Sequence, residues 1–389
     1  MSLNSHQQEL ILATVPLLRQ GGEALTRHFY ALMFRDYPEV KPLFNQSHQQ
    51  DGRQARALAG AVLAYAENIR NPAVLASAIE GIVHKHVSLS IQPEHYPIVG
   101  NSLLKAMGEV LGDTLTPEIA AAWEAAYWQL ANLLIGAEEN VYADHAARPG
   151  GWRGERTFII SDKCDESSVI TSFLLTPEDH QPVMDFLPGQ YIGLSLTIGG
   201  ERLRRNYSLS DAPNGRTYRI SVKREITGRV SGFLHDHMHR GDRVALSTPS
   251  GEFTLDNSNR PVNLITAGVG ITPAMAMLEA YAGARPIRFI HAAISGKHHA
   301  FRERVNMLAE QHDNVSAHYL YEQRQEGDGA HSQGRLQQEL LARILHHDGD
   351  CYFLGPLPFM RAVKQQLNAL DIPEERQHFE FFGPQEALA

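Results

Sequence analysis

The spacing of apolar residues changes twice along this chain, and each spacing favours a different kind of fold. Up to about residue 145, apolar residues recur at steps of three and four, as in Leu58, Val62 and Tyr65, which is the period of an amphipathic helix. Further on, short runs alternate between apolar and polar residues, as in "TYRISVKR" at 217–224, which is typical of strands. From about residue 261, strand-like runs alternate with helical ones, which indicates an open parallel sheet.

These spacings predict a multidomain chain with three successive folds. The segment "ARPGGWRGER" at 147–156 combines several glycines with a proline, which indicates a linker after the helical part. We therefore expect an all-α domain at 1–147, an antiparallel β-barrel domain at 152–258 and an α/β parallel-sheet domain at 259–389.

Composition excludes several classes of function. Of 389 residues, 35 are Lys or Arg and 44 are Asp or Glu, which gives a net charge of −9 and argues against a nucleic-acid partner. No apolar run reaches the length of a membrane span, and the first residues lack the pattern of a secretory signal. The two cysteines, Cys164 and Cys351, form no zinc or iron–sulfur pattern. We expect a cytoplasmic protein with no evident obligate protein partner; its oligomeric state is not readable from the sequence.

Two histidines stand close together in the helical part, in "GIVHKHVSLS" at 81–90. Side chains two positions apart on a helix point to nearly opposite sides, so at most one of the two faces the core. His86 shares its face with Val83 and Leu89, which makes His86 the inward one. On this pattern alone, a core histidine bonded to a neighbour is the commoner interpretation, and a metal ligand is the alternative.

A glycine-rich loop, "AGVGITP" at 267–273, follows a strand-like run and precedes a helical one. Backbone N–H groups at such a helix start bind phosphate. The pattern is G-x-G-x-x-P, in which Pro273 replaces the usual glycine or alanine of the dinucleotide fingerprint. The expected phosphate-binding residues are Gly268, Val269, Gly270, Ile271, Thr272 and Pro273.

The β-rich part carries three short motifs, "RRNYSLS" at 204–210, "VKREITGRVS" at 222–231 and "STPSGEF" at 247–253. An arginine can clamp a diphosphate and a tyrosine can stack on a flat cofactor, although the first motif alone also fits a plain strand. Together, Arg-x-Tyr-Ser, Gly-x-Val-Ser and Pro-x-Gly-x-Phe resemble the ferredoxin-reductase-like family. In that family the β-barrel holds FAD and the next domain binds NADH or NADPH.

The resemblance implies which residues contact the flavin. The segment "EFFGP" at 380–384 resembles the one that covers the flavin edge where nicotinamide enters. The implied contacts are Tyr191, Arg205, Asn206, Tyr207, Ser208 and Ser231, together with Glu380, Phe381, Phe382, Gly383 and Pro384. One departure concerns Leu354, which stands where the family has a cysteine near the nicotinamide, and it puts the rate of hydride transfer in doubt.

The helical part resembles a bacterial globin in "HFYALMF" at 28–34, "HKHVSLSIQPEHYPIVG" at 84–100 and "WQLANLLIGAEENVY" at 128–142. A globin followed by this reductase is the arrangement of the flavohaemoglobins, and the resemblance covers essentially the whole chain. It implies that His86 is the proximal ligand of a haem b iron, that Glu138 accepts a hydrogen bond from His86, and that Tyr96 completes this network. The other residues implied around the haem are Tyr30, Gln54 and Leu58 on the opposite face, Phe44 against the porphyrin, and Lys85, with Glu380, between the two cofactors.

The resemblance also implies a reaction. In flavohaemoglobins NAD(P)H reduces FAD, FAD reduces the haem iron, and haem-bound O2 converts nitric oxide to nitrate. Two alternatives remain: a haem reductase of peroxides, including lipid peroxides, and a globin-based oxygen or redox sensor. NADH and NADPH are not distinguished, because Arg302 and Arg304 could meet a 2′-phosphate or could equally be solvated helix charges.

Overall fold

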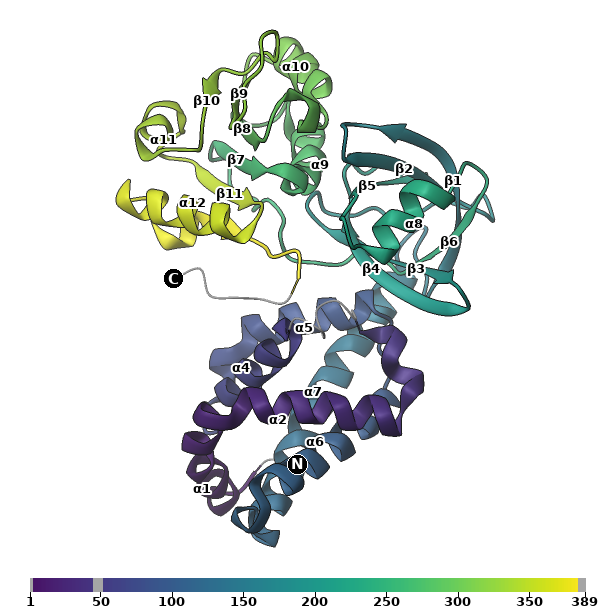
Figure 1. Cartoon of the computed structure of the whole chain (residues 1–389), viewed down its shortest axis with the longest axis vertical. Helices are drawn as coiled ribbons and strands as arrows, with labels where there is room; N and C mark the ends of the chain where they lie inside the picture. Colours follow the sequence, from purple (N-terminus) through teal and green to yellow (C-terminus); the bar gives the residue numbers. More distant parts are fainter. Residues whose placement is uncertain (1–2, 45–51, 384–389) are drawn as a thin grey trace. The chain divides into compact units, whose positions relative to one another are not determined.

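The computed structural model describes residues 3–44 and 52–383. The described residues divide into two compact units: those up to 147, with 195–204 and Gly383, form the first, and 148–194 with 205–382 form the second. Among the described residues, no helix combines the length and the hydrophobicity that a membrane span needs. The predicted order of folds, helical, then antiparallel β, then parallel α/β, is the observed one (Figure 1).

The described residues up to 147 form helices and short turns and contain no strand, as their apolar spacing predicts. The α-helices are α1 (Ser5–Ala13), α2 (Val15–Asp36), α4 (Arg53–Glu67), α5 (Ala76–Ser88), α6 (His95–Leu111) and α7 (Pro117–Ala147), with short 3-10 turns at Pro38–Leu43, Pro72–Leu75 and Gly112–Thr114. The Asn4 side chain caps α1 by accepting from the N–H of Gln7, and Gln7 bonds back to Asn4. Proline opens the turn at Pro72 and helix α7 at Pro117, where the missing N–H costs no helical hydrogen bond.

Helices α2 and α4 cross at close range, because small residues lie at their contact. The Cβ of Ala59 would be 3.5 Å from a side chain built on Gly22. Nearby, the Thr26 hydroxyl donates to the carbonyl of Ala55 on the other helix, at 2.7 Å. This close packing holds α2, which carries Tyr30, against α4, which carries Gln54.

The first sheet is the predicted antiparallel barrel. Its strands are β1 (Arg156–Asp165), β2 (Ile170–Pro177), β3 (Tyr191–Ile198), β4 (Glu201–Ser208), β5 (Tyr218–Lys223) and β6 (Arg243–Leu246), in the order β4-β3-β6-β1-β2-β5. An antiparallel bridge between Leu209, just after β4, and Ile220 on β5 joins the two edges of the sheet. Helix α8 (Arg229–His237) follows β5.

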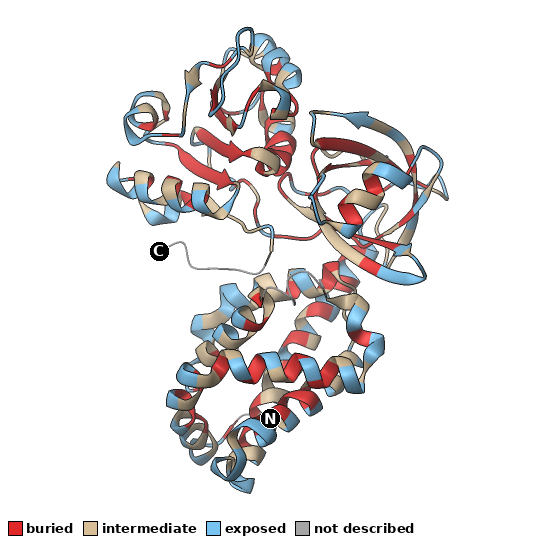
Figure 2. Cartoon of the chain, in the orientation of Figure 1, coloured by how far each residue is buried: buried red, intermediate tan, exposed pale blue. Residues whose placement is uncertain are grey.

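The second sheet is parallel, as the alternation of strands and helices predicts. Its strands are β7 (Val262–Ala267), β8 (Ile287–Ala293), β9 (Val315–Tyr321), β10 (Ser332–Gln333), β11 (Asp350–Leu354) and β12 (Gln377–Phe379), in the order β10-β9-β8-β7-β11-β12. Its helices are α9 (Ile271–Tyr281), α10 (Arg302–Gln311), α11 (Gln338–Ile344) and α12 (Leu357–Ala369). Residues of α9 and α10 share one apolar core with the sheet, and residues of α11 and α12 share another. Both faces of the central strands are therefore buried (Figure 2).

Candidate functional site

His86 belongs to a network of three polar side chains in the helical unit, in which Glu138 and Tyr96 are buried and His86 is partly exposed. The ring nitrogen Nδ1 of His86 lies 2.7 Å from Oε1 of Glu138 on α7. The hydroxyl of Tyr96, on α6, donates to the same oxygen at 2.5 Å and lies 3.2 Å from Nδ1 of His86. Glu138 is only 2 % exposed. The carboxyl group therefore sits away from solvent, with its oxygen shared between an imidazole and a phenol.

A second tyrosine, which sequence reasoning missed, holds this network in position. The Tyr127 hydroxyl donates to the backbone carbonyl of Tyr96 at 2.5 Å. The Tyr127 ring can approach because residue 100 is glycine: a Cβ there would lie 2.5 Å from the ring. Burial, and then the hydrogen bond to Glu138, raise the pKa of Tyr96, so its hydroxyl keeps its proton and remains a donor.

The polar residues implied for the opposite haem face lie on α2 and α4. The Tyr30 ring is buried among aromatic side chains, with ring centroids 5.7 Å from Phe44 and 5.8 Å from Phe34. Gln54 and Leu58 lie one turn apart on α4. Among the described residues, Oε1 of Gln54 is buried and has no hydrogen-bond partner. A buried amide oxygen of this kind calls for a ligand or a water molecule that donates to it.

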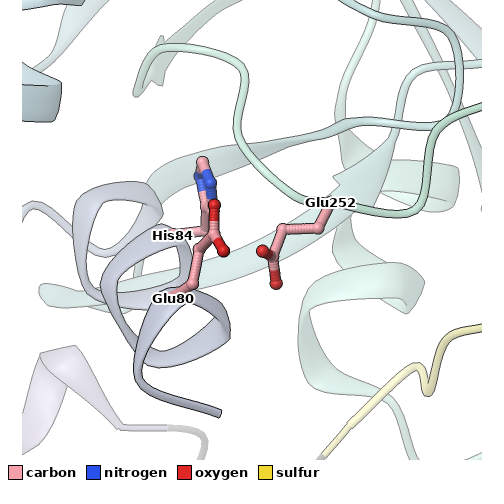
Figure 3. A group of neighbouring side chains, drawn as sticks. All are labelled: Glu80, His84 and Glu252. Carbon is pink, nitrogen blue, oxygen red and sulfur yellow. The ribbon is translucent and has the colours of Figure 1, made fainter. Parts of the chain in front are cut away.

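His84 takes no part in the network of His86. It lies on α5 one turn after Glu80, and Figure 3 shows these two side chains next to each other on the helix. Burial lowers the pKa of His84, and the neighbouring Glu80 opposes that shift. His84 is therefore a partly buried, neutral histidine at neutral pH.

The flavin motifs of the sequence converge in the second unit. The backbone of Tyr191 exchanges two hydrogen bonds with Ser250, at 2.9 and 2.8 Å. The Tyr191 ring then lies over Gly251, where a Cβ would be 2.8 Å from the ring and where φ is +112°. The N–H of Leu209, just after β4, donates to the carbonyl of Gln190. The motifs around 190, 208 and 250 thus meet although they are far apart in sequence.

Two serines of these motifs differ in their surroundings. Among the described residues, the hydroxyl of Ser208 is buried without a hydrogen-bond partner. The hydroxyl of Ser231, in the first turn of α8, accepts from the N–H of Glu225 and donates to the carbonyl of Gly228, both at 3.2 Å. The Ser208 hydroxyl is therefore available to bond to a polar ligand. The Ser231 hydroxyl, in contrast, stabilises the turn before α8. Arg205, Asn206 and Tyr207 precede Ser208 on β4.

The glycine loop lies where the sequence predicts it, between β7 and α9. Gly268 has φ +54°, and Gly270 packs so closely that a Cβ would lie 2.2 Å from the carbonyl oxygen of Leu354. Pro273 stands in the first turn of α9, where a helix has no partner for the missing N–H. The departure from the usual fingerprint therefore costs the loop no hydrogen bond.

The segment around Leu354 and the C-terminal motif are described in part. Leu354 ends β11 and is only 1 % exposed, within the apolar core shared with α9 and α10. Phe381 packs edge-on against Phe379, with centroids 5.8 Å apart. Pro384, which the sequence assigns to the flavin cover, lies outside the described residues. The placement of Lys85 and Glu380 between the two cofactors stays a prediction.

A charged cluster joins α9 to the β-barrel, and the sequence gives no sign of it. The side chain of Glu279 on α9 is only 4 % exposed, and its Oε1 accepts from Nε of Arg304 at 2.9 Å. Arg219, on β5, approaches the same oxygen at 3.5 Å. Burial, and then a hydrogen bond with Asp211, raise the pKa of Glu279 to about 6. Arg304 is thus held by a carboxylate of its own chain.

Comparisons with known proteins agree with this division of the chain. Three families match it: globin at residues 27–134, the oxidoreductase FAD-binding domain at 157–255 and the oxidoreductase NAD-binding domain at 264–365.

Among curated proteins, the flavohemoprotein of Pseudomonas aeruginosa is 55% identical over 390 residues, covering 99% of both chains. The flavohemoprotein of Pseudomonas putida is 52% identical, covering 99% of this chain and 100% of its own. Among solved structures, a flavohemoglobin of Malassezia yamatoensis with bound FAD and heme matches with a TM-score of 0.88 at 26% identity, covering 98% of this chain and 100% of that one. The FAD/NAD-binding domain of a nitric oxide dioxygenase from Vibrio cholerae, 42% identical, covers 59% of this chain and 99% of that one, with a TM-score of 0.56. The chain belongs to the flavohaemoprotein family, as an oxidoreductase in which a globin domain precedes FAD- and NAD-binding domains.

Proposed function

We propose that this chain is a nitric oxide dioxygenase that holds haem b at His86 and FAD at the β-barrel. In the overall reaction, two molecules of nitric oxide and two of O2 become two nitrate ions, while one NAD(P)H is oxidised to NAD(P)+ and one proton is released. The haem supplies the iron centre for O2, and the flavin divides the electron pair of a hydride into single electrons. The observation that carries the proposal is the network of His86, Glu138 and Tyr96.

This network fixes which nitrogen of His86 is free to bind a metal. A carboxylate only accepts hydrogen bonds, so Nδ1 of His86 carries the proton that it shares with Glu138. The other ring nitrogen, Nε2, then presents its lone pair. A carboxylate partner makes a ligating imidazole more electron-rich, which favours the higher oxidation states of iron that oxygen chemistry passes through.

The residues of α2 and α4 support the same proposal from the other side. Tyr30 brings a phenol and Gln54 brings an amide to an otherwise apolar surface. Hydrogen-bond donors placed there stabilise negative charge as it develops on an oxygen ligand. Among the described residues, the buried Oε1 of Gln54 has no hydrogen-bond partner, which supports a ligand or water molecule beside this amide.

In the second unit, the proposed roles follow the motifs that meet there. Tyr191, Arg205, Asn206, Tyr207, Ser208 and Ser231 hold the flavin, with the arginine opposite its diphosphate and Ser208 near its reactive ring. The loop Gly268–Pro273 offers backbone N–H groups to the dinucleotide phosphates at the start of α9. The role of covering the flavin edge is assigned to Glu380, Phe381, Phe382, Gly383 and Pro384, the last of which lies outside the described residues.

The test separates the two halves of the chain. His86→Ala should lose the Soret absorbance and all enzymatic consumption of nitric oxide above the uncatalysed reaction with O2, while NAD(P)H-driven reduction of a dye by the flavin stays at the parent rate. His84→Ala, on the other side of α5, is the matched control and should keep both activities. A His86→Ala variant that retains the parent haem spectrum would overturn the ligand assignment.

The same proximal network also suits peroxide chemistry, since peroxidases rely on an electron-rich imidazole. A competition assay distinguishes the two substrates. With nitric oxide and an alkyl hydroperoxide present together, we expect nitric oxide to be consumed first and the hydroperoxide to persist. A protein that only sensed gas would oxidise NAD(P)H slowly under both conditions.

A further inference from the structure

A group of basic side chains lies near the amino ends of the parallel strands, away from the glycine loop. Arg288 is the second residue of β8. Its neighbour Phe289 belongs to the apolar core shared with α9 and α10, so Arg288 points to the other face of the sheet, which α11 and α12 cover. The glycine loop follows the carboxyl end of β7. Arg288 therefore lies at the edge of the sheet opposite the proposed dinucleotide site.

The strands on either side of β8 bring two histidines to Arg288. In the register of the sheet, Arg288 lies beside Ser316 on β9 and Asn263 on β7. His318, two residues after Ser316, lies on the same face as Arg288. On the β7 side, the Asn263 side chain donates to the carbonyl of His346 at 3.0 Å and accepts from its N–H at 2.9 Å. These two bonds hold His346 at the same end of the sheet.

A third histidine comes from the loop before β10. The ring of His331 stacks on that of His318, with centroids 5.1 Å apart. Nδ1 of His331 accepts from the backbone N–H of Tyr319 at 3.1 Å, so Nε2 carries the proton of this ring and is a donor. Nε2 of His318 lies 2.9 Å from the hydroxyl of Ser332. Both rings are thus held in place by the fold.

Arg288 differs from the buried arginine nearby. The side chain of Arg285, just before β8, is only 6 % exposed and reaches a carboxylate oxygen of Asp256 at 3.4 Å. Among the residues that the structure describes, Nε of Arg288 is buried and has no hydrogen-bond partner. Burial lowers the pKa of Arg288. A buried guanidinium donor of this kind requires a ligand or a water molecule to satisfy it.

The charges around Arg288 are mostly of its own sign. Burial, and then the positive charges of His331, Arg343 and Arg288, lower the pKa of His318 to about 4. Burial, and then the charge of Arg288, also lower the pKa of His346, and the exposed carboxylate of Asp348 opposes that shift. An anion bound here would relieve this repulsion.

We propose that Arg288, Arg343, His318 and His331 form a binding site for a phosphate group, carried either by inorganic phosphate or by a small phosphorylated metabolite. A guanidinium group presents its N–H donors in a fork that matches the oxygens of a phosphate. The stacked imidazoles add donors from the neighbouring strand and loop. The site is separate from the haem, the flavin and the glycine loop, so it does not depend on the proposed function.

The experiment measures binding of inorganic phosphate to the full-length holoprotein by calorimetry, at constant ionic strength in a buffer without phosphate. We expect one phosphate per chain with a Kd of about 1 mM or lower. Arg288→Met keeps the apolar stem but removes the guanidinium, and it should weaken binding at least about tenfold, the scale of one charged hydrogen bond. NADH-driven dye reduction at the parent rate would show that this variant is folded.

Two further variants keep the test decisive. Arg343→Met, a change at an exposed residue of α11 that leaves the sheet intact, should weaken phosphate binding about 1.5- to 5-fold. Arg335→Met is the control, because it removes an exposed charge that is paired with Glu322 just after β10. It should leave the Kd for phosphate as in the parent.

Glycerol 3-phosphate distinguishes the two sources of the phosphate group. Tighter binding than inorganic phosphate would indicate a phosphorylated metabolite, and equal or weaker binding would indicate inorganic phosphate; either result supports the site. A saturating concentration of NAD+ should leave the Kd unchanged. Competition between NAD+ and phosphate would overturn the proposal, because the phosphate would then bind at the glycine loop. So would equal weakening in Arg288→Met and Arg335→Met, or a parent protein that binds no phosphate at about 10 mM.

Discussion

The carboxylate of Glu138 is the residue on which the chemistry of the helical unit depends most. It is buried, and it accepts from both His86 and Tyr96. Glu139, one position later on α7, is exposed. The structure therefore offers two adjacent acids, only one of which reaches the histidine.

Glu138→Gln should raise the reduction potential of the bound haem while the haem itself stays in place. Glutamine keeps the size of the side chain and a hydrogen bond to His86, but it removes a negative charge that stabilises the ferric iron. Potentiometric titration of the Soret band measures the change. Nitric oxide consumption should fall, and dye reduction by the flavin should not change.

Glu139→Gln is the matched control and should leave the potential where it is in the parent. A shift with Glu139→Gln and none with Glu138→Gln would contradict the contacts described for α7. If neither change moves the potential, the charge on Glu138 has no influence on the iron.

Tyr30→Phe should weaken the retention of O2. The substitution keeps the ring, and with it the packing against Phe34 and Phe44, but it removes the phenolic hydroxyl group. A hydrogen bond to a polar or partly charged group contributes about 1–3 kcal/mol, so O2 should dissociate about 5- to 150-fold faster. Flash photolysis or stopped flow measures the rate. An unchanged rate would mean that the Tyr30 hydroxyl makes no bond to O2.

At the scale of elements, Gly270 couples the glycine loop to the end of β11. Gly270→Ala would place a Cβ 2.2 Å from the carbonyl oxygen of Leu354, so the loop or the strand must shift. We expect NAD(P)H-driven dye reduction to fall at least about tenfold, because a displacement of about 1 Å in a binding loop has effects of that size or larger.

Gly283→Ala, after α9, is the control for that change. Its nearest neighbour, the ring of His312, would be 3.6 Å from the new Cβ, an ordinary contact. Dye reduction should therefore match the parent. Equal losses in both variants would show that the close approach at Gly270 is not what limits the loop.

The cluster of Asp211, Arg219, Glu279 and Arg304 should make stability depend on pH. Burial, and then the hydrogen bond with Asp211, raise the pKa of Glu279 from 4.5 to about 6. Between these values the folded chain binds more protons than the unfolded chain, so stability falls as pH rises through about 4.5 to 6. The loss is about 2 kcal/mol at most. The midpoint of thermal unfolding, followed by flavin fluorescence between pH 4.5 and 7, measures it.

Glu279→Gln removes the titrating group and should flatten that pH dependence, whereas Glu303→Gln, exposed on α10, should not. If stability changes with pH equally in the parent and in Glu279→Gln, Glu279 is not the group that binds the extra proton in the folded chain.

Sequence patterns predict the elements of this chain well where one residue decides the local structure. The glycine loop and the strand motifs are readable from spacing and residue type, whereas the partners of His86 follow only from the resemblance to the globins of the flavohaemoglobins. The surroundings of Arg288 and Glu279 are not readable, because they depend on strands, loops and helices that meet only in the folded chain. Tyr127 is a third example, since its bond to Tyr96 requires the absence of a side chain at Gly100.

At the scale of the whole molecule, three periods of hydrophobicity predict three folds in the right order. The period of a helix, the alternation of a half-buried strand and the buried runs of a parallel sheet are distinct signals. Closure of the barrel by the bridge between Leu209 and Ile220 is a tertiary feature, and no local pattern specifies it. The domain limits at 147, 152, 258 and 259 stay predictions.

The central claim is that the chain joins nitric oxide to O2, and the product of the reaction tests it most directly. Nitric oxide that reacts with O2 in water without a catalyst yields nitrite, so nitrate distinguishes the enzyme from the background reaction. We expect the full-length holoprotein, supplied with NADH, isotopically labelled O2 and nitric oxide, to form one nitrate for each nitric oxide, with two labelled oxygen atoms in each nitrate. His86→Ala should give only the uncatalysed nitrite. Nitrite or nitrous oxide as the main product of the parent protein, or unlabelled nitrate, would contradict the proposed function.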